Sequence, residues 1–464
     1  MVFSSIEFLF FFLPIFLVLY GLTPARFKNM TLLSGSLIFY AHGEPKYLLL
    51  LMVCVLVDYF AGLRLGQKNS GRKRTKETEY EQNIDRRRKL WLWAAVAFHA
   101  GLLASFKFGM EGRLPLGVSF YTFMSLSYLI DVCRGVQKRE TSFVALATFI
   151  TMFPHLTSGP ITKYGEVRDH LQAREFSAKS VQDGFKVFTV GLAFKVLLAD
   201  RVGLLWRSVQ VTGFESISTQ LAWLAAAAYS MKIYFDFFGY SLMAMGLGRM
   251  LGFKLPENFR HPYMAASVKE FYRRWHITLG RWFREYVYIP LGGNRKGEFR
   301  TVCNLLAVWL LTAVWHGGTA NFLIWGMLLW LFIVMERRLE AIGVLKALER
   351  FPGKILTRLY LWTVIPVTWM CFAITDVGQL QIFLGRMFGV VEGIRVNGAD
   401  WINALKTYGM LLGAGFILCT PAVQKLYRRY KDTLLGAVVL AALFWFCVWR
   451  LQVEGQNPFM YSNF

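Results

Sequence analysis

The segment from Tyr47 to Leu65 reads YLLLLMVCVLVDYFAGLRL. Asp58 and Arg64 are its only charged residues. A run of about 20 apolar residues is long enough for an α-helix to cross the hydrocarbon core of a bilayer. A helix also satisfies its own backbone hydrogen bonds, which lipid cannot do. The segment therefore predicts a transmembrane helix.

Apolar runs of this kind recur along the whole chain and predict an all-α, polytopic integral membrane protein. We expect about ten to thirteen transmembrane or re-entrant helices by the length criterion. Met30–Tyr40 and Phe143–Phe153 are short, and we expect them to be re-entrant or half-buried. The candidate runs are Phe3–Tyr20, Met30–Tyr40, Tyr47–Leu65, Leu90–Phe106, Leu114–Asp131, Phe143–Phe153, Val181–Leu198, Leu221–Phe238, Ser241–Phe253, Val302–Val314, Phe322–Met335, Leu359–Ile374, Trp401–Thr420 and Leu434–Trp449.

Composition excludes the soluble classes. Of 464 residues, 55% are hydrophobic, 16% aromatic and only 17% charged, and the mean hydropathy is +0.39. Soluble domains carry about 25% charged residues, so this chain has too little charged surface to solvate soluble cores. The six cysteines show neither CxxC nor metal-ligand spacing, and we interpret them as small core residues.

The net charge of +23 is explained by basic loops rather than by nucleic-acid binding, which we do not expect. The loop Gln67–Lys89 holds nine Lys and Arg residues, so the positive-inside rule places it in the cytoplasm. Arg337–Arg358 and Lys425–Lys431 are also expected inside. Counting crossings from these loops puts both the N-terminus and the C-terminus outside. The N-terminal run lacks a basic leader and a cleavage site, so we expect it to be retained as the first helix.

One segment, Leu255–Arg300, is not a clean span. It mixes many charged residues with aromatic ones, and a charge at membrane depth costs roughly 2.5–3.5 kcal/mol. We therefore expect it to lie at the interface or to line a cavity, with a turn at Gly292–Asn294. We treat residues 255–318 as the core segment for chemistry within a single transmembrane domain, 1–464.

His316 is the strongest candidate for chemistry, in the sequence VWHGG between two apolar runs. The glycines after it end a helix and let a substrate approach the backbone. An ionisable residue within a membrane segment is a functional candidate, and neutral imidazole suits a general base. A buried histidine that ties two helices together is an equally good interpretation at this point.

His276 lies in FYRRWHITL. On a helix, Arg273 and Arg274 would fall within one turn of it, and their guanidinium groups suit phosphate or carbonyl recognition. The alternative is a basic amphipathic helix on anionic lipid headgroups. His155, in a broken stretch after Phe153, and His261, before Pro262, are expected to be structural.

No signature of another chemistry is present. The sequence contains no GxSxG elbow and no GxxxxGK[ST] loop, which argues against a serine hydrolase and an ATP-driven pump. Two distant histidines do not make a zinc site, so we expect no metal. Asp58, Asp131 and Asp236 are carboxylates at or near membrane depth; they suit a proton relay or the fixing of arginines and helix ends.

Eight motifs in one order along the chain resemble the membrane-bound O-acyltransferase family, and within it the alginate O-acetyltransferase branch. The run Tyr288–Arg295, YIPLGGNR, and the ending Asn457–Tyr461 favour this branch over the D-alanyl transferases of teichoic acid. The matching segments are Met1–Ser5, Leu116–Phe123, Thr157–Ile161, Tyr234–Ser241, Arg273–Leu279, Trp282–Arg295, Trp315–Gly317 and Asn457–Tyr461.

The resemblance implies a ring of helices around a central funnel. The two histidines of the family map onto His316 and His276, which we predict to be catalytic. His316 would act as general base, and His276 would orient the acyl group or the acceptor, or stabilise an oxyanion. The residues that we predict to bind substrate are Trp275, Arg274, Arg284, Asp236, Tyr240 and Trp315.

The resemblance also implies an activity. An acetyl group from a cytoplasmic thioester donor, acetyl-CoA, would cross the bacterial plasma membrane for O-acetylation of an extracytoplasmic polysaccharide. A partner of the SGNH esterase-like type would complete the transfer, and no cofactor would be bound. The alternatives are D-alanyl transfer to teichoic acid, an acyl or sugar transporter without bond transfer, and a structural subunit of an export complex. Acylation of a lipid or a protein is a further alternative.

Overall fold

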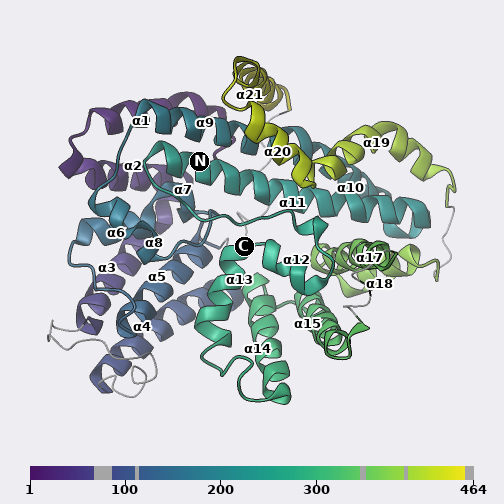
Figure 1. The fold of residues 1–464 in the computed structure, drawn as a ribbon, viewed down its shortest axis with the longest axis horizontal. Coiled ribbons are helices and arrows are strands. Elements are labelled where there is room, and N and C mark those ends of the chain that lie inside the picture. The colour runs from purple at the N-terminus through teal and green to yellow at the C-terminus, as the bar shows by residue number, and fades with distance from the viewer. Residues whose placement is uncertain (67–85, 110–113, 345–347, 349–351, 391–395, 455–464) are drawn as a thin grey trace. The chain divides into compact units, whose positions relative to one another are not determined.

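A computed structural model describes residues 1–66, 86–109, 114–344, 348, 352–390 and 396–454 (Figure 1). Every regular element in these ranges is helical, and none is a strand, which confirms the all-α prediction. The first 19 residues of the basic loop, 67–85, and the ending Asn457–Tyr461 lie outside the described residues.

The described helices confirm a polytopic membrane protein. Two shorter apolar helices are Phe8–Leu22 and Val118–Cys133, and a bent pair, Asp400–Leu418 with Pro421–Tyr430, makes one further span if it crosses as a unit. The number of crossings stays a prediction. Five described helices are long and apolar enough to cross a bilayer, namely Pro45–Leu65, Arg86–Gly109, Glu298–His316, Gly353–Ala373 and Leu434–Glu454.

The chain divides into two compact units, and the prediction of a single domain is not tested by this division. The first unit holds Met1–Phe188 and Tyr240–Pro256. Helices α9 and α11 run from one unit into the other. The helices of this unit are η1 Phe8–Phe12, α1 Leu13–Leu22, η2 Ala25–Phe27, α2 Lys28–Gly43, η3 Pro45–Tyr47, α3 Leu48–Leu65, α4 Arg86–Ala104, η4 Ser105–Gly109, α5 Val118–Cys133, α6 Phe143–Thr151, α7 Phe153–Leu156, α8 Tyr164–Gln172 and α9 Ala178–Ala193.

A buried polar cluster ties three helices of the first unit together. His99 Nε2 on α4 lies 2.7 Å from Asp58 Oδ1 on α3, and both side chains are fully buried. Ser125 on α5 donates its hydroxyl to the other oxygen of Asp58. Asp58 therefore bonds a histidine and a serine, and its role in the fold is to join α3, α4 and α5, which pack together.

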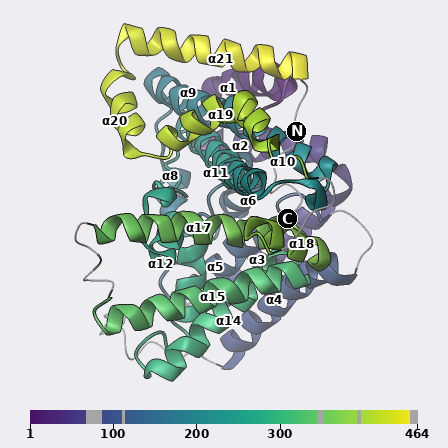
Figure 2. The ribbon, with the colours of Figure 1, turned by 90° about the vertical axis from the view of Figure 1, so that its right-hand side faces the viewer.

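The second unit holds Thr189–Gly239 and the described residues from Glu257 onward. In it α14 packs on α15, and α15 packs on α17; Figure 2 shows these three helices side by side. Its elements are η5 Phe194–Ala199, α10 Asp200–Thr212, η6 Phe214–Ser216, α11 Thr219–Met250, η7 Pro262–Met264, α12 Val268–Arg274, α13 Ile277–Phe283, η8 Arg284–Tyr288, α14 Glu298–His316, α15 Ala320–Ala341, α17 Gly353–Ala373, α18 Val377–Met387, α19 Asp400–Leu418, α20 Pro421–Tyr430 and α21 Leu434–Glu454.

Helix α11 corrects one expectation. The two candidate spans Leu221–Phe238 and Ser241–Phe253 are one continuous helix of 32 residues, Thr219–Met250. Gly239 does not break it. A Cβ at Gly239 would lie 2.6 Å from the backbone oxygen of Gly191, so this glycine serves the close packing of two helices.

The segment Leu255–Arg300 is irregular, as the sequence predicts. It consists of extended chain, the short helices η7, α12 and α13, and the π-helix η8. Gly292 and Gly293 both have positive φ, 109° and 55°, in the turn expected after Pro290. No element that lies wholly within this segment is long enough to cross a bilayer, and α14 begins only at Glu298.

Candidate active site

His316 is the last residue of α14. Gly317 follows with φ 146°, a conformation that L side chains rarely adopt, so the helix ends there. The His316 side chain is buried, with 5% of the residue exposed. The sequence prediction of a helix end at the glycines is confirmed, and it places the imidazole at a helix terminus.

Aromatic rings surround the His316 imidazole. The ring centroid of Trp315 lies 4.5 Å away, that of Phe372 5.0 Å and that of Trp325 5.1 Å. Phe322 stacks on the imidazole at 5.8 Å. These rings shield the imidazole from water, in keeping with the 5% exposure of the residue.

Asn321 holds this aromatic wall in place. Its side chain is fully buried, and Nδ2 donates to the backbone oxygens of Cys371 and Phe372 at 3.3 Å each. These two carbonyls belong to the last turn of α17, whose intrahelical partners are missing. Asn321 therefore caps α17 and fixes Phe372 beside His316.

His276 does not lie on a helix, which corrects the local prediction. Helix α12 ends at Arg274 and α13 begins at Ile277, and His276 lies between them with φ 43°. The left-handed region is uncommon for a residue other than glycine. Such conformations persist only where the surrounding structure enforces them and are concentrated at functional sites.

Asn258 enforces this conformation. Its backbone oxygen accepts from Ile277 N at 2.9 Å. Its Oδ1 lies 3.2 Å from His276 Nδ1 and accepts from Thr278 Oγ1 at 2.6 Å. Because this oxygen is an acceptor, Nδ1 of His276 carries the proton. Its other ring nitrogen, Nε2, then presents a lone pair.

That second nitrogen is buried and unpaired. Among the described residues, no hydrogen-bond partner faces His276 Nε2, and only 4% of the residue is exposed. Burial lowers the pKa of His276 to about 3, so the ring is neutral at physiological pH. A buried acceptor without a partner costs free energy unless a ligand or water satisfies it.

One aromatic cluster connects the two histidines. Trp275 lies next to His276 in the chain, and its ring centroid is 4.9 Å from that of Trp369. Trp369 in turn contacts Phe372 at 5.6 Å, and Phe372 contacts His316. The structure therefore brings His276, Trp275, Trp315 and His316 to the edges of the same cluster.

The two predicted arginines lie differently. Arg274 forms an ion pair with Glu270, one turn earlier on α12, and both side chains are about one-third exposed. Arg284, the first residue of η8, is exposed. Neither guanidinium is buried with the histidines, so any contact that these residues make with substrate would be at the surface of this segment.

Asp236 belongs to a buried ion cluster that the sequence analysis missed. Lys195 Nζ lies 2.9 Å from Asp236 Oδ1 and 2.7 Å from Asp200 Oδ1, and the Lys195 side chain is only 4% exposed. Burial, and then the Asp236 charge, raise the pKa of Asp200 to about 6 despite Lys195. The sequence did carry one signal of this cluster, because Lys195 and Asp236 are charged residues within two apolar runs.

Tyr240, the remaining predicted substrate residue, lies in the first unit. Its hydroxyl hydrogen-bonds the Thr157 hydroxyl at 2.5 Å, and its ring stacks on Phe3 at 4.8 Å. Three segments of the resemblance, those around Phe3, Thr157 and Tyr240, thus meet at one place. The contacts of Tyr240 in the structure are therefore packing and hydrogen-bonding contacts with these segments.

Glu336 is a further residue that sequence analysis missed. Its buried carboxylate on α15 accepts from the backbone N–H groups of Val268 at 2.6 Å and Lys269 at 2.9 Å, and from the Tyr360 hydroxyl at 3.1 Å. It therefore caps α12, the helix that leads to His276. Its position just before the basic segment Arg337–Arg358 gave no sign of this role.

The chain belongs to the membrane-bound O-acyltransferase family, whose model matches residues 38–374. It is 33% identical to the probable alginate O-acetylase AlgI of Pseudomonas putida, with all of both chains covered. The corresponding Pseudomonas aeruginosa protein is 39% identical over 93% of this chain and 84% of its own. The peptidoglycan O-acetyltransferase of Helicobacter pylori is 31% identical over 84% and 80%. The chain is therefore an O-acyltransferase of the membrane.

Proposed function

We propose that this protein passes an acetyl group from cytoplasmic acetyl-CoA across the bacterial plasma membrane, for O-acetylation of an extracytoplasmic polysaccharide. An SGNH esterase-like partner receives the acetyl group and delivers it to the glycan. The observation that carries the proposal is the pair of buried histidines at one aromatic cluster, of which His276 presents an unpaired Nε2.

The reaction is a transfer of the acetyl group between sulfur and oxygen. His316 takes the proton of an acceptor hydroxyl as the hydroxyl oxygen bonds to the carbonyl carbon of the thioester. The carbon–sulfur bond then breaks, and the thiolate of CoA takes that proton and leaves as a thiol. The products are an acetyl ester and CoA, and no proton is gained or lost overall.

His276 positions the acceptor in this proposal. Its protonated Nδ1 faces Asn258, so Nε2 accepts a hydrogen bond from a second donor of the acceptor, such as a neighbouring sugar hydroxyl or a backbone N–H beside a partner serine. An oxyanion needs a donor at Nε2, which is the other tautomer. Of the roles considered for His276, orientation of the acceptor is therefore the one we propose.

The direction of transfer rests on charge. The basic segments Arg337–Arg358 and Lys425–Lys431 favour the cytoplasmic side, where CoA phosphates would meet them, and both termini then lie outside. Trp275 and Trp315 would bind the acyl group, while Arg274 and Arg284 would contact phosphates of the donor at the surface. Asp236 and Tyr240 would support the site through their own contacts.

The test uses the full chain in detergent together with its SGNH-type partner and acetyl-CoA labelled in the acetyl group. Free CoA and label on partner or glycan are followed for the wild type, His316→Ala and His42→Ala. His42 is a matched control because it is half-exposed and its nearest carboxylate, on Glu7, is 3.7 Å away. We expect the first variant to lose transfer and the second to retain it.

Three results would contradict the proposal. Normal label transfer by a folded His316→Ala variant would remove the general base. Absence of CoA release by the folded wild type, with release from a D-alanyl carrier-protein thioester instead, would indicate D-alanyl transfer. Movement of an acylated substrate into vesicles without bond transfer would indicate a transporter.

A further inference from the structure

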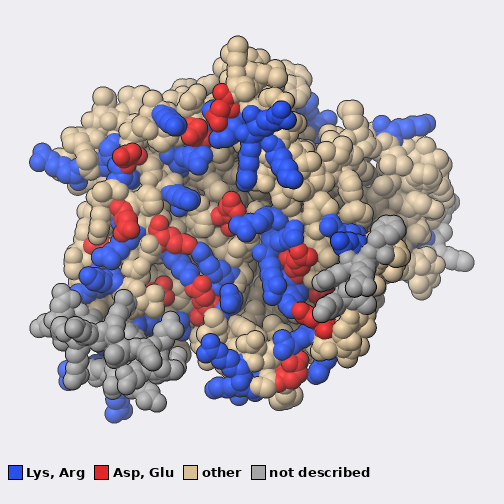
Figure 3. Space-filling view, in the orientation of Figure 1, with Lys and Arg blue, Asp and Glu red and all other residues tan. Residues whose placement is uncertain are grey.

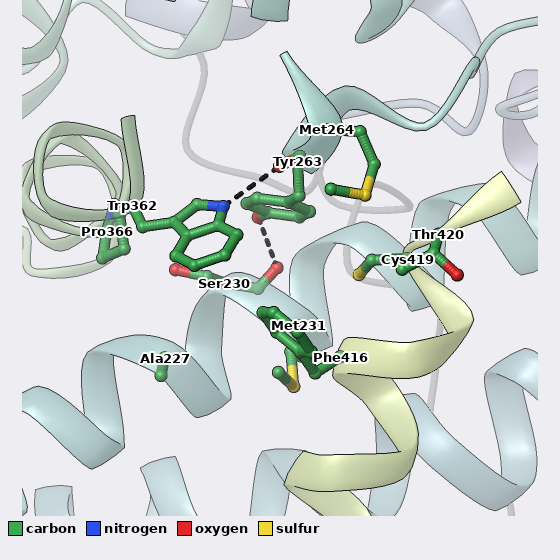
Figure 4. A pocket seen from close by; sticks show the side chains of 10 residues that line it. All are labelled: Ala227, Ser230, Met231, Tyr263, Met264, Trp362, Pro366, Phe416, Cys419 and Thr420. Atoms are coloured by element: carbon green, nitrogen blue, oxygen red, sulfur yellow. Dashed lines mark hydrogen bonds between the residues drawn. The ribbon is translucent and has the colours of Figure 1, made fainter. Parts of the chain in front are cut away.

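The second unit contains a pocket that is separate from the two histidines (Figure 4). Its volume is about 190 Å³. Ala227, Ser230 and Met231 of α11 form one wall, and Trp362 and Pro366 of α17 form another. The pocket is larger than an engineered apolar cavity of about 150 Å³ that binds benzene, so it has room for part of a hydrocarbon chain.

The polar groups in the pocket wall are already used. The Tyr263 hydroxyl donates to the backbone oxygen of Ser230 at 2.7 Å, and Trp362 Nε1 donates to the backbone oxygen of Tyr263 at 3.1 Å. Both bonds are drawn in Figure 4. The space between these residues is therefore lined by carbon and sulfur, which favours an apolar occupant over a polar one.

The pocket adjoins the start of α20. Phe416 and Cys419, at the end of α19, line it, and Thr420 lies at its edge. Helix α20 begins at the next residue and is bent by 76° from α19. His261 holds the bend: its two ring nitrogens lie 3.3 Å from the Cys419 backbone oxygen and 3.0 Å from Gln424 Oε1.

Helix α20 carries a basic face next to this pocket. Lys425, Arg428 and Arg429 are exposed, and their i, i+3 and i+4 spacing puts them on one side of the helix. Figure 3 shows Lys and Arg side chains gathered over α20. At 1.5 Å per residue, Lys425 lies roughly 8 Å along the helix from Thr420. An apolar pocket and three cations are thus within one amphiphile's length of each other.

We propose that this site binds an anionic phospholipid, with one acyl chain in the pocket between α11 and α17 and the headgroup phosphate on Lys425, Arg428 and Arg429. A phospholipid carries an apolar acyl chain next to an anionic phosphate, which matches the apolar pocket next to the three cations. An amphipathic helix lying beside an apolar span is also the usual geometry at a membrane interface, and basic residues there attract anionic lipid.

The test uses the full chain in nanodiscs and a phosphatidylglycerol probe with a photoreactive diazirine in mid-chain. Crosslinked peptides are mapped by mass spectrometry. We expect label on the segments around Met231, Trp362 and Phe416. Unlabelled phosphatidylglycerol should compete at least tenfold better than phosphatidylcholine, because only the former carries a net negative charge.

Three variants distinguish binding of the lipid's acyl chain from binding of its headgroup. Ala227→Trp fills the pocket and should abolish the label. The triple variant Lys425→Gln, Arg428→Gln, Arg429→Gln changes only exposed residues, and should lower phosphatidylglycerol labelling at least tenfold. Lys406→Gln removes an exposed cation of α19 instead and should change nothing.

The proposal is overturned if the pocket peptides are not labelled, if the triple variant labels like the wild type, or if both lipids compete equally. The last result would leave an apolar pocket with no headgroup preference. Since lipid labelling is read without any acyl donor, failure here is distinguishable from failure of the acetyl-transfer proposal.

Discussion

The two histidines are held in opposite ways. His316 ends a regular helix of 19 residues and is surrounded by aromatic rings. His276 lies between two helices of seven residues each, in a left-handed conformation held by Asn258. The first position is fixed by packing and the second by hydrogen bonds. A substitution can therefore disturb the position of one histidine and leave the position of the other unchanged.

The largest effect should come from removing the His316 imidazole. We expect His316→Ala to lower kcat/KM by about 10²–10⁴-fold, the usual contribution of general acid–base catalysis. If the two histidines act in one step, the double variant with His276→Ala is no slower than His316→Ala alone, because residues that act as a unit are not additive. A double variant slower by the product of the two single effects would show that they act independently.

Replacement of Asn258 should affect His276 selectively. Asn258→Ala removes the acceptors of Nδ1 and of Thr278 Oγ1, and should cost about 1–3 kcal/mol of stability, as for buried unpaired groups. It should also lower activity. Asn258→Asp keeps an acceptor at this place and adds a charge that raises the His276 pKa.

The measurement is the pH profile of kcat/KM for the wild type and both variants of Asn258. An acid limb that moves to higher pH in Asn258→Asp, with activity partly restored relative to Asn258→Ala, indicates a positioning role. Equal loss in both variants, with no change in the profile, would reduce Asn258 to a packing residue.

Replacement of Asn321 is the matching change for His316, because Asn321 supports the aromatic rings around that histidine. Asn321→Leu leaves the carbonyls of Cys371 and Phe372 without this donor and should lower stability by about 1 kcal/mol, the typical worth of a hydrogen bond. Thermal unfolding in detergent checks the stability. Activity should fall while the pH profile stays that of the wild type, since His276 is not touched. A shifted acid limb in the pH profile of Asn321→Leu would contradict the expectation that Asn321 and Asn258 support the two histidines independently.

The smallest effect is the pH dependence of stability. The folded pKa of His276 is about 3, against about 6.5 in an unfolded chain. The unfolded state therefore binds more protons in between, and stability falls as the pH drops below 6.5. From pH 7 to pH 5.5 this histidine should cost about 1 kcal/mol.

Thermal unfolding of the wild type and of His276→Gln, which does not titrate, measures that difference. The variant should lose less stability between the two pH values. An identical pH dependence in both proteins would show that His276 is charged, or solvated, in the folded state.

The sequence predicts the helical membrane fold well, because the length of an apolar run is itself the criterion for a span. It also predicts the helix end at His316, since Gly317 and Gly318 can adopt positive φ. It fails where it divides α11 into the two spans Leu221–Phe238 and Ser241–Phe253, because Gly239 between them serves close packing and the helix continues through it. Whether a glycine breaks or packs depends on the neighbouring helix, which the local sequence does not contain.

The supports of the candidate site lie far from it in sequence, which is why they were missed. Asn258 holds His276 across 18 residues, and Glu336 caps α12 across 68. Lys195 reaches Asp236 from the preceding apolar run. Each partner is an ordinary polar residue in its own segment. Motifs identify the residues that could do chemistry, whereas the contacts that orient them require the folded chain.

The cap on α12 has a consequence for biosynthesis. Ser267 caps the helix locally, through its bond to Glu270 N at 3.1 Å, and is made together with it. Glu336 and Tyr360, which complete the junction, leave the ribosome only after about 60 to 90 further residues have been added. During insertion, the segment that carries His276 therefore gains its last contacts only when residues of two later helices, α15 and α17, have been made. A nascent chain halted before α17 would contain every predicted catalytic residue and the Glu336 cap, but it would still lack Tyr360, whose hydroxyl bonds the Glu336 carboxylate.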